Sequence, residues 1–119
     1  MKITKQNSEE YDWGQKCKGW HLVNTNELSV IQEIMPSGTK EIKHKHSTSQ
    51  QFFFILKGVA TFLIDGEKHK INNNEGIHIQ PNIFHQISNE TNENLEFIVI
   101  SQPHSHGDRI IENDGNKNT

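Results

Sequence analysis

The sequence has little of what several protein classes require. It contains a single cysteine, Cys17, so no disulfide can form within the chain, and a reducing, cytoplasmic setting is expected. Its longest apolar stretch, Phe52 to Leu56, is far too short to span a bilayer, and the first residues lack a signal-peptide core. The basic residues are scattered and the net charge is −3. We therefore expect neither nucleic acid nor a membrane as a partner.

Strong helix formers are also scarce. The chain has one Ala and five Leu, against fifteen Ile and six Phe, which suit strands. This balance favours an all-β domain, although an AT-rich genome would also enrich Ile, Asn and Lys through codon usage. With 119 residues, the chain is long enough for one domain with one core.

Short apolar runs separated by turn residues begin at Leu28. We predict strands at Leu28–Met35, Glu41–His46, Gln51–Leu56, Val59–Ile64, Glu67–Ile71, Gly76–Ile79, Phe84–Asn89 and Leu95–Ser101. Asp65-Gly66 is a strong signal for a two-residue hairpin loop. Short strands at close spacing, without a helical period, predict a sandwich or a barrel.

The chain divides into three predicted segments. Residues 1–27 are expected to form an arm that packs on the barrel, residues 28–101 the barrel itself, and residues 102–119 a C-terminal segment that is disordered at its end. Within the arm, Trp13 and residues 17–21 either supply an aromatic wall over a pocket or pack on the outside of the sheet.

Three histidines are the most informative residues for function. His44 and His46 are separated by one residue, so in a strand both side chains leave the same face of the sheet. Together with His85 from a distant strand, they predict a facial metal site inside an all-β scaffold. The alternatives are a solvated surface pair for the first two and a turn histidine, just after Pro81, for the third.

The residues around these histidines resemble the first motif of the cupin superfamily. In that motif a Gly opens the strand, two His and a Glu bind metal, and a Gly closes the turn; here Gly38, His44, His46, Gln51 and Gly58 stand at these positions. The second motif is looser: Pro81, His85 and Asn89 match it. Asn74 and Glu75 stand where cupins carry Gly-Asp, Gln80 stands at the usual first Pro, and Asn82 takes the place of a Gly. The resemblance covers roughly residues 28–101 and is closest to small single-domain bacterial cupins.

The resemblance implies a six- to eight-stranded jelly-roll β-barrel with one divalent metal bound inside, commonly as a homodimer. The family's ligands map to His44, His46, Gln51 and His85. Imidazole and oxygen ligands suit Fe, Mn, Ni, Zn or Cu, so the ligand types do not choose among these metals.

Gln51 departs from the family pattern, because a Glu is expected there. A Gln carbonyl oxygen can bind a divalent ion but brings no negative charge. Three neutral imidazoles and an amide would leave the full charge on the ion, which predicts looser binding and a stronger Lewis acid. The alternative is that Gln51 donates a hydrogen bond beside a site made of three histidines alone.

Two functions from different classes follow. The first is a small metalloenzyme, dioxygenase-like or isomerase-like, that acts on a small polar molecule. The second is a non-catalytic module that binds or senses a small molecule such as a sugar or a carboxylate. The sequence shows no glycine-rich phosphate loop, no serine nucleophile elbow and no paired carboxylates at catalytic spacing. An isomerase needs a general base, which the predicted ligand set does not provide.

The Phe run predicts association. Phe53 and Ile55 share strand parity with Gln51 and are expected to point inward, whereas Phe52 and Phe54 face the other side. Covering that outer face favours a homodimer, unless the N-terminal arm covers it within the same chain.

The C-terminal segment contains a second His-x-His pair, His104 and His106. It indicates either a second metal site or a structured turn that closes the barrel end. Arg109 either binds a carboxylate substrate in bidentate fashion or pairs with Asp108 or a Glu.

Overall fold

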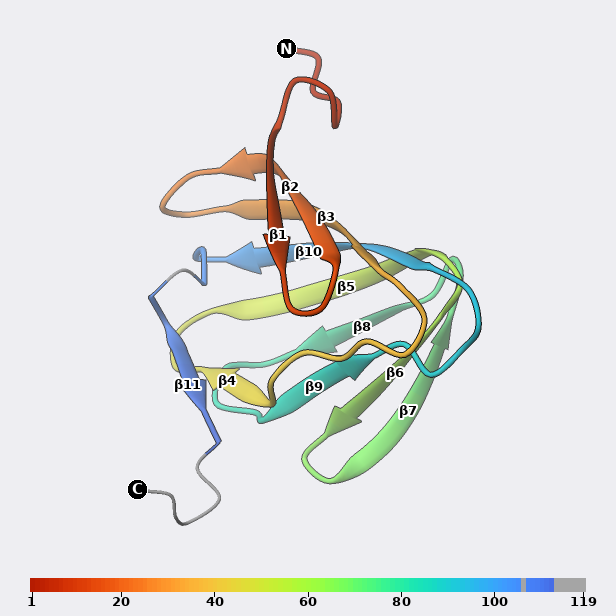
Figure 1. Ribbon diagram of the computed structural model, residues 1–119. Coiled ribbons are helices and arrows are strands. Elements are labelled where there is room, and N and C mark those ends of the chain that lie inside the picture. The colour runs from red at the N-terminus through yellow and green to blue at the C-terminus, as the bar shows by residue number, and fades with distance from the viewer. Residues whose placement is uncertain (106, 113–119) are drawn as a thin grey trace.

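The computed structural model describes residues 1–105 and 107–112, and these contain eleven strands and no helix (Figure 1). The strands are β1 (Glu9–Trp13), β2 (Cys17–Asn24), β3 (Ser29–Met35), β4 (His44–His46), β5 (Gln50–Lys57), β6 (Val59–Ile64), β7 (Glu67–Asn72), β8 (Gly76–Ile79), β9 (His85–Ser88), β10 (Leu95–Gln102) and β11 (Arg109–Ile111). The all-β prediction is confirmed. The described part of the chain contains no helix that could cross a membrane.

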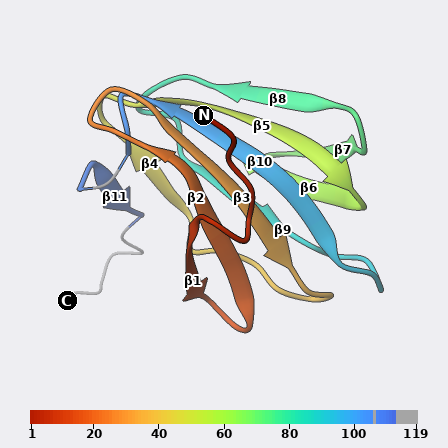
Figure 2. The same ribbon diagram turned by 90° about the horizontal axis from the view of Figure 1, so that it is seen from above.

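The strands form two antiparallel sheets that pack against each other, as Figure 2 shows from above. One sheet has the order β1-β2-β3-β10-β5-β8 and the other β11-β4-β9-β6-β7. Neighbours in each sheet are mostly distant in sequence, which is the pattern of a jelly roll. The tight connections lie where turn residues predicted them: Asp65 and Gly66 have φ values of 50° and 90° in the loop between β6 and β7, as a type I′ hairpin turn requires.

Each of the eight predicted runs corresponds to one of the strands β3 to β10. The largest difference is at Glu41–His46, where the regular strand begins only at His44. The Glu41 side chain explains this, because its carboxylate accepts a hydrogen bond from the Ile87 backbone N–H at 3.1 Å. That N–H would otherwise bond a backbone carbonyl of the neighbouring strand, so the regular ladder is interrupted there.

Two strands, β1 and β2, lie in the segment for which the sequence analysis predicted an arm. They form a hairpin with a three-residue loop, and β2 pairs with β3, so the hairpin extends the six-stranded sheet at its edge. Trp13 packs against the buried core from the inner side, whereas the Lys5 ammonium lies 4.7 Å from the centre of the Trp20 ring.

The C-terminal segment adds one further strand that was not predicted. β11 pairs with β4, with Arg109 opposite His46 and Ile111 opposite His44. The predicted disorder of the C-terminal end concerns residues 113–119, which lie outside the described residues.

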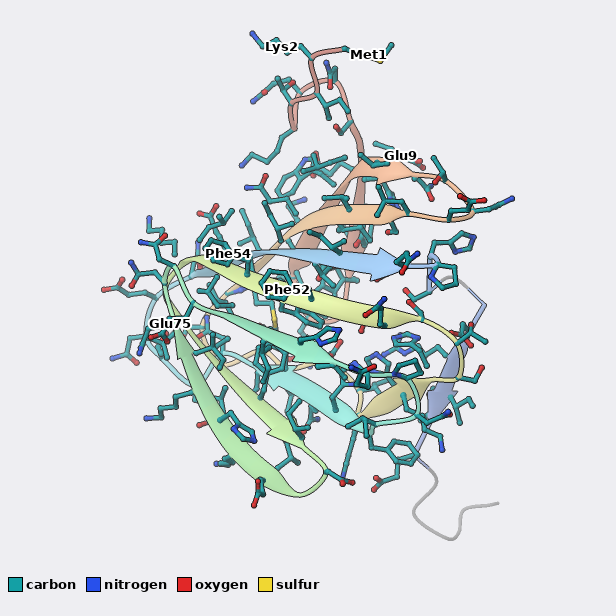
Figure 3. All side chains as sticks on the ribbon, turned by 180° about the vertical axis from the view of Figure 1, so that it is seen from behind. Met1, Lys2, Glu9, Phe52, Phe54 and Glu75 are labelled. Atoms are coloured by element: carbon teal, nitrogen blue, oxygen red, sulfur yellow. The ribbon has the colours of Figure 1, made fainter. Side chains whose placement is uncertain are left out.

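The inward-facing residues separate into an apolar end and a polar end. On β5, Gln51, Phe53 and Ile55 are buried, which confirms the predicted parity, and Phe52 is 39% exposed on the outer face. Figure 3 shows the outward-facing Phe52 and Phe54, with ring centroids 6.3 Å apart. The most deeply buried apolar side chains are Phe62, Phe97, Met35, Ile55, Ile87 and Leu95. At the other end of the same strands the inward positions become polar.

Candidate metal centre

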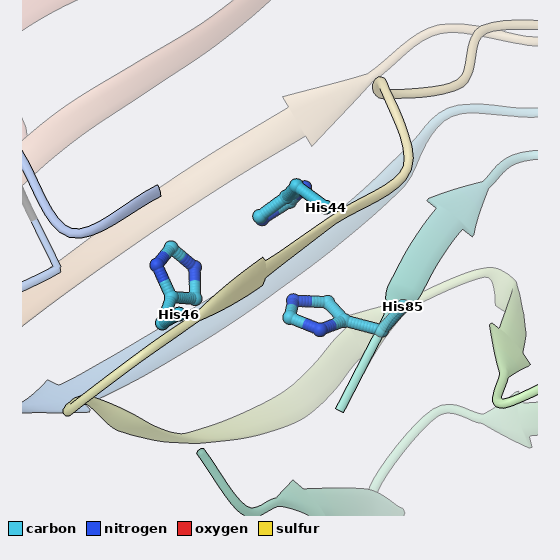
Figure 4. Close-up of side chains that lie close together, drawn as sticks. All are labelled: His44, His46 and His85. Atoms are coloured by element: carbon cyan, nitrogen blue, oxygen red, sulfur yellow. The ribbon is translucent and has the colours of Figure 1, made fainter. Parts of the chain in front are cut away.

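The three histidines come together in the interior, as predicted from their spacing. β4 presents His44 and His46 on one face, and β9 places His85 directly opposite His44 (Figure 4). All three side chains are buried. One ring nitrogen from each histidine lies within 4.8 Å of a ring nitrogen of each of the other two. The surface-pair and turn-histidine alternatives are therefore wrong for these residues.

Backbone carbonyls orient two of the rings. His44 Nδ1 lies 2.7 Å from the Ile42 carbonyl oxygen, and His85 Nδ1 lies 2.9 Å from the Ile83 carbonyl oxygen. A carbonyl can only accept, so each Nδ1 carries the hydrogen and each Nε2 keeps its lone pair for another partner. This is the arrangement found behind metal-binding histidines.

Several of these nitrogens have no partner within the described residues. His85 Nε2 and both ring nitrogens of His46 are buried without a hydrogen bond. Buried polar atoms are normally paired, so this cluster of unpaired nitrogens fits a bound cation. The donor set therefore suits a divalent transition metal.

The protonation state of the rings also suits a metal. Burial lowers the pKa of His44 to about 3 and that of His85 to about 4, and it lowers the pKa of His46 as well. All three imidazoles are therefore neutral at pH 7, which is the form that binds metals.

Gln51 reaches the interior from the other sheet. Its amide nitrogen donates a hydrogen bond to Ser101 Oγ at 2.9 Å, whereas its carbonyl oxygen is buried and has no partner among the described residues. The oxygen is thus the atom available for a further interaction, which fits the predicted ligand role. The orienting-donor alternative stays a prediction, because the amide group has a second N–H besides the one that donates to Ser101.

Comparisons with known proteins agree with this fold. A model of the cupin domain family matches residues 30–101. The chain belongs to the cupin family. The uncharacterized protein MJ1618 of Methanocaldococcus jannaschii is 36% identical over 84 residues, which cover 70% of this chain and 67% of that protein.

Two solved structures illustrate the range of the fold. A predicted oxalate decarboxylase from Thermotoga maritima superposes with a TM-score of 0.81 at 19% identity, over 87% of this chain and 100% of that chain. A sugar phosphate isomerase of the cupin superfamily from Silicibacter pomeroyi has a TM-score of 0.75 at 16% identity, over 87% of this chain and 76% of that chain. At such identities the likeness shows the fold alone.

This cupin also carries an acid–base pair that the sequence analysis missed. Tyr11 Oη donates a hydrogen bond to Glu33 Oε2 at 2.5 Å, between β1 and β3. Burial raises the pKa of Glu33 to about 7, although the Tyr11 hydrogen bond and the charge of Arg109 oppose the rise. Burial also raises the pKa of Tyr11 well above its usual value. The one available signal was Glu33 itself, a charged residue with the same parity as the apolar inward positions of its strand.

A second carboxyl belongs to the same interior. Burial raises the pKa of Glu41 to about 8, and the charge of Glu33 raises it further, whereas Arg109 lowers it. The charge of Glu33 thus affects the titration of Glu41, although the two residues do not stand at catalytic spacing in the sequence. Glu33 lies on β3, whereas Glu41 lies in the segment before β4, so only the tertiary packing brings them within electrostatic range of each other.

The second His-x-His pair lies only partly in the described part of the chain, because His106 falls outside it. Within the described part, His44, His46 and His85 form the one group of three or more histidine, cysteine or acidic side chains whose atoms are close enough to share an ion. The His104 N–H donates to the Asn26 carbonyl at 3.3 Å.

Proposed function

We propose that this cupin is a mononuclear metal-dependent enzyme that acts on a small polar molecule. The convergence of His44, His46 and His85, with buried ring nitrogens that lack a partner among the described residues, carries the proposal. The unpaired carbonyl oxygen of Gln51 supports a fourth ligand from the opposite sheet. A divalent metal held there would supply a Lewis acid that polarises a substrate oxygen.

The acid–base pair favours an isomerase-like proton transfer over a dioxygenase reaction. A general base works best when its pKa is near the working pH, and the pKa of Glu33 is raised to about 7. Tyr11 remains protonated at that pH and holds the Glu33 carboxylate through its hydrogen bond. Glu33 would accept a proton from a substrate carbon and return it to a neighbouring atom.

The apolar neighbours of the histidines support the same site. The Phe53 ring lies 6.4 Å from the His85 ring, centroid to centroid, and it also packs on Phe62 and Phe97. This wall excludes water from one side of the histidines, and a low local dielectric strengthens charge interactions with a bound substrate.

Metal analysis tests the first part of the proposal. Purified protein should contain about one transition metal ion per chain, and His44→Ala and His46→Ala should each lose most of it. His69→Ala is the matched control, because His69 is exposed on β7, on an edge strand of the same sheet. Full metal occupancy in both site variants would exclude the site.

Reaction type is tested by following C–H exchange in D₂O with dihydroxyacetone and other small hydroxyketones. Exchange without dioxygen uptake, lost in Glu33→Gln with metal retained, is the expected result. Metal-dependent dioxygen uptake with small diketones or phenols, unchanged in Glu33→Gln, would make the protein a dioxygenase. Ligand binding without either reaction would favour a binding or sensing module.

A further inference from the structure

Arg109 is the single arginine of the sequence, and its place in the sheet directs it toward the histidines. β11 pairs with β4 so that Arg109 stands opposite His46. Residues directly opposite in an antiparallel pair project from the same face. Arg109 therefore leaves β11 on the face from which His44 and His46 project, although its own side chain is exposed at the sheet edge.

Asp108 fixes the chain just before Arg109. Its carboxylate accepts hydrogen bonds from the backbone N–H groups of Ser47, Thr48 and Ser49 at 2.9–3.0 Å, and from the hydroxyls of the first two. These residues form the turn that directly follows His46. The C-terminal segment is thus tied to the metal-binding strand at a defined register.

The same contacts show that Arg109 does not pair with Asp108, which was one of the alternatives that the sequence left open. Asp108 uses both carboxylate oxygens on the turn, and no ion pair joins Arg109 to any carboxylate within residues 1–105 and 107–112. The neighbouring lysines, in contrast to Arg109, each have a side-chain partner among the described residues. Lys43 pairs with Glu112 at 3.1 Å, and the Lys45 ammonium lies 4.8 Å from the centre of the Phe84 ring.

The charge of Arg109 reaches both sheets. Burial has the largest effect on the pKa of each of the three histidines and of Glu33 and Glu41, and the positive charge of Arg109 lowers the pKa of all five. The guanidinium therefore lies within electrostatic range of the histidine cluster and of the acid–base pair together.

We propose that Arg109 binds the carboxylate of a small organic acid whose other end lies at the three histidines. The assignment rests on the proposed function, because it takes the histidine cluster as the reaction site. A guanidinium presents two parallel N–H donors that match the two oxygens of a carboxylate. A single arginine whose charge is opposed by the nearby Glu33 and Glu41 carboxyls suits a monoanion better than a phosphate dianion, which proteins usually hold with several donors.

The test measures binding of pyruvate to the zinc-loaded full-length protein by NMR titration. Arg109→Gln should weaken pyruvate binding at least about tenfold, because it removes the charge and the paired donors while leaving the zinc content unchanged. Lys45→Gln is the matched control: it removes the same charge from the strand next to β11, at a residue whose ammonium lies over Phe84. Its pyruvate dissociation constant should stay within about twofold of the wild type.

Further titrations identify the chemical group that Arg109 binds. Pyruvamide, which lacks the negative charge, should bind equally weakly to the wild type and to Arg109→Gln. Arg109→Lys keeps the charge but not the paired donors, so it should recover only part of the affinity. Inorganic phosphate should bind more weakly than pyruvate.

Three results would overturn the inference. They are equal pyruvate affinity in the wild type and Arg109→Gln, an equal loss in Lys45→Gln, or tighter binding of phosphate than of pyruvate. An absence of pyruvate binding to the wild type would also overturn it. None of these results touches the metal site, whose test is the zinc content of the histidine variants.

Discussion

At the residue scale, Gln51 distinguishes this site from the usual cupin ligand set. Its amide nitrogen donates to Ser101, and its buried carbonyl oxygen has no partner within residues 1–105 and 107–112. If Gln51 joins the three histidines, these neutral ligands would leave the full charge on a bound ion, which would then polarise a substrate oxygen more strongly at the expense of affinity.

Gln51→Glu should bind Zn²⁺ or Mn²⁺ at least about tenfold more tightly than the wild type, because a carboxylate adds a negative charge next to a desolvated ion. Ser101 can turn its hydroxyl to donate to the new carboxylate, so the fold should be kept. Titration of the metal into stripped protein measures the change. Gln50→Glu adds the same charge one residue earlier, at the opposite strand parity, and should change the affinity little. Equal or weaker binding by Gln51→Glu would leave a site of three histidines.

The raised pKa of Glu33 makes the stability of the folded protein depend on pH. Its folded pKa of about 7 lies above the unfolded value of 4.5, so the folded state binds the extra proton between these values. The contribution of Glu33 to the free energy of unfolding is therefore fully present below pH 4.5 and is lost as the pH rises through 7.

The Glu33→Gln side chain cannot titrate, and it keeps an acceptor for Tyr11. The wild type should therefore lose stability relative to this variant as the pH rises, by about 1–3 kcal/mol between pH 4.5 and pH 8. Urea unfolding of metal-free protein at the two pH values measures this. Glu27→Gln, at an exposed position between β2 and β3, should show no such difference. A pH-independent effect of Glu33→Gln would mean that the carboxyl is solvated.

At the element scale, the β1–β2 hairpin owes its geometry to a residue without a side chain. Gly19 stands opposite Tyr11 in the register, and a Cβ on Gly19 would lie 2.3 Å from Tyr11 Cζ. The tyrosine ring thus occupies the space over the glycine, and from there its hydroxyl reaches Glu33. Gly19 positions the acid–base pair without contacting a substrate.

Gly19→Ala should destabilise the protein by about 1–3 kcal/mol, because the added methyl group overlaps the ring of Tyr11. In a Tyr11→Ala background the same change should cost much less, since the ring is gone. Chemical denaturation of the four proteins of this double-mutant cycle gives the coupling energy. An equal cost in both backgrounds would show that the ring is not what excludes a side chain at this position.

At the scale of the whole molecule, the outer face of the six-stranded sheet is unusually apolar. Phe52 and Phe54 lie there beside outward-facing residues of β10 and β3, while the N-terminal hairpin joins the far edge of the sheet. The hairpin therefore leaves Phe52 exposed, contrary to the alternative in which the arm covers it within one chain. Exposed patches of this kind commonly mark protein–protein contacts.

We expect a homodimer that buries this face, and light scattering should find about twice the 13.7 kDa chain mass. Phe52→Lys should shift the protein toward monomer, because a charge would be buried in the interface. Ile42→Lys is the control, since Ile42 is 58% exposed and precedes β4 of the other sheet. A wild-type monomer at micromolar concentration would contradict the expectation.

The sequence by itself determined the strands β3 to β10 and the convergence of His44 and His46 on one face, because both depend on local periodicity. Alternation along β5 placed Gln51 and Phe53 on one face, and the His-x-His spacing placed two of the clustered histidines on one face of another strand. Gly58, with a φ of 91°, allows the immediate turn from β5 to β6, and this too is a property of one residue.

Tertiary structure alone decided the rest of the site. Glu33, Glu41 and Arg109 come from β3, from the segment before β4 and from β11, and only the order of strands in two packed sheets brings their charges within range of one another. Their shifted pKa values arise from burial between those sheets, which no local pattern reports. Asp108 likewise binds the turn after His46 and does not pair with the neighbouring Arg109. This turn offers five hydrogen-bond donors, but it lies some sixty residues away in the sequence, so only the tertiary structure brings the donors to Asp108.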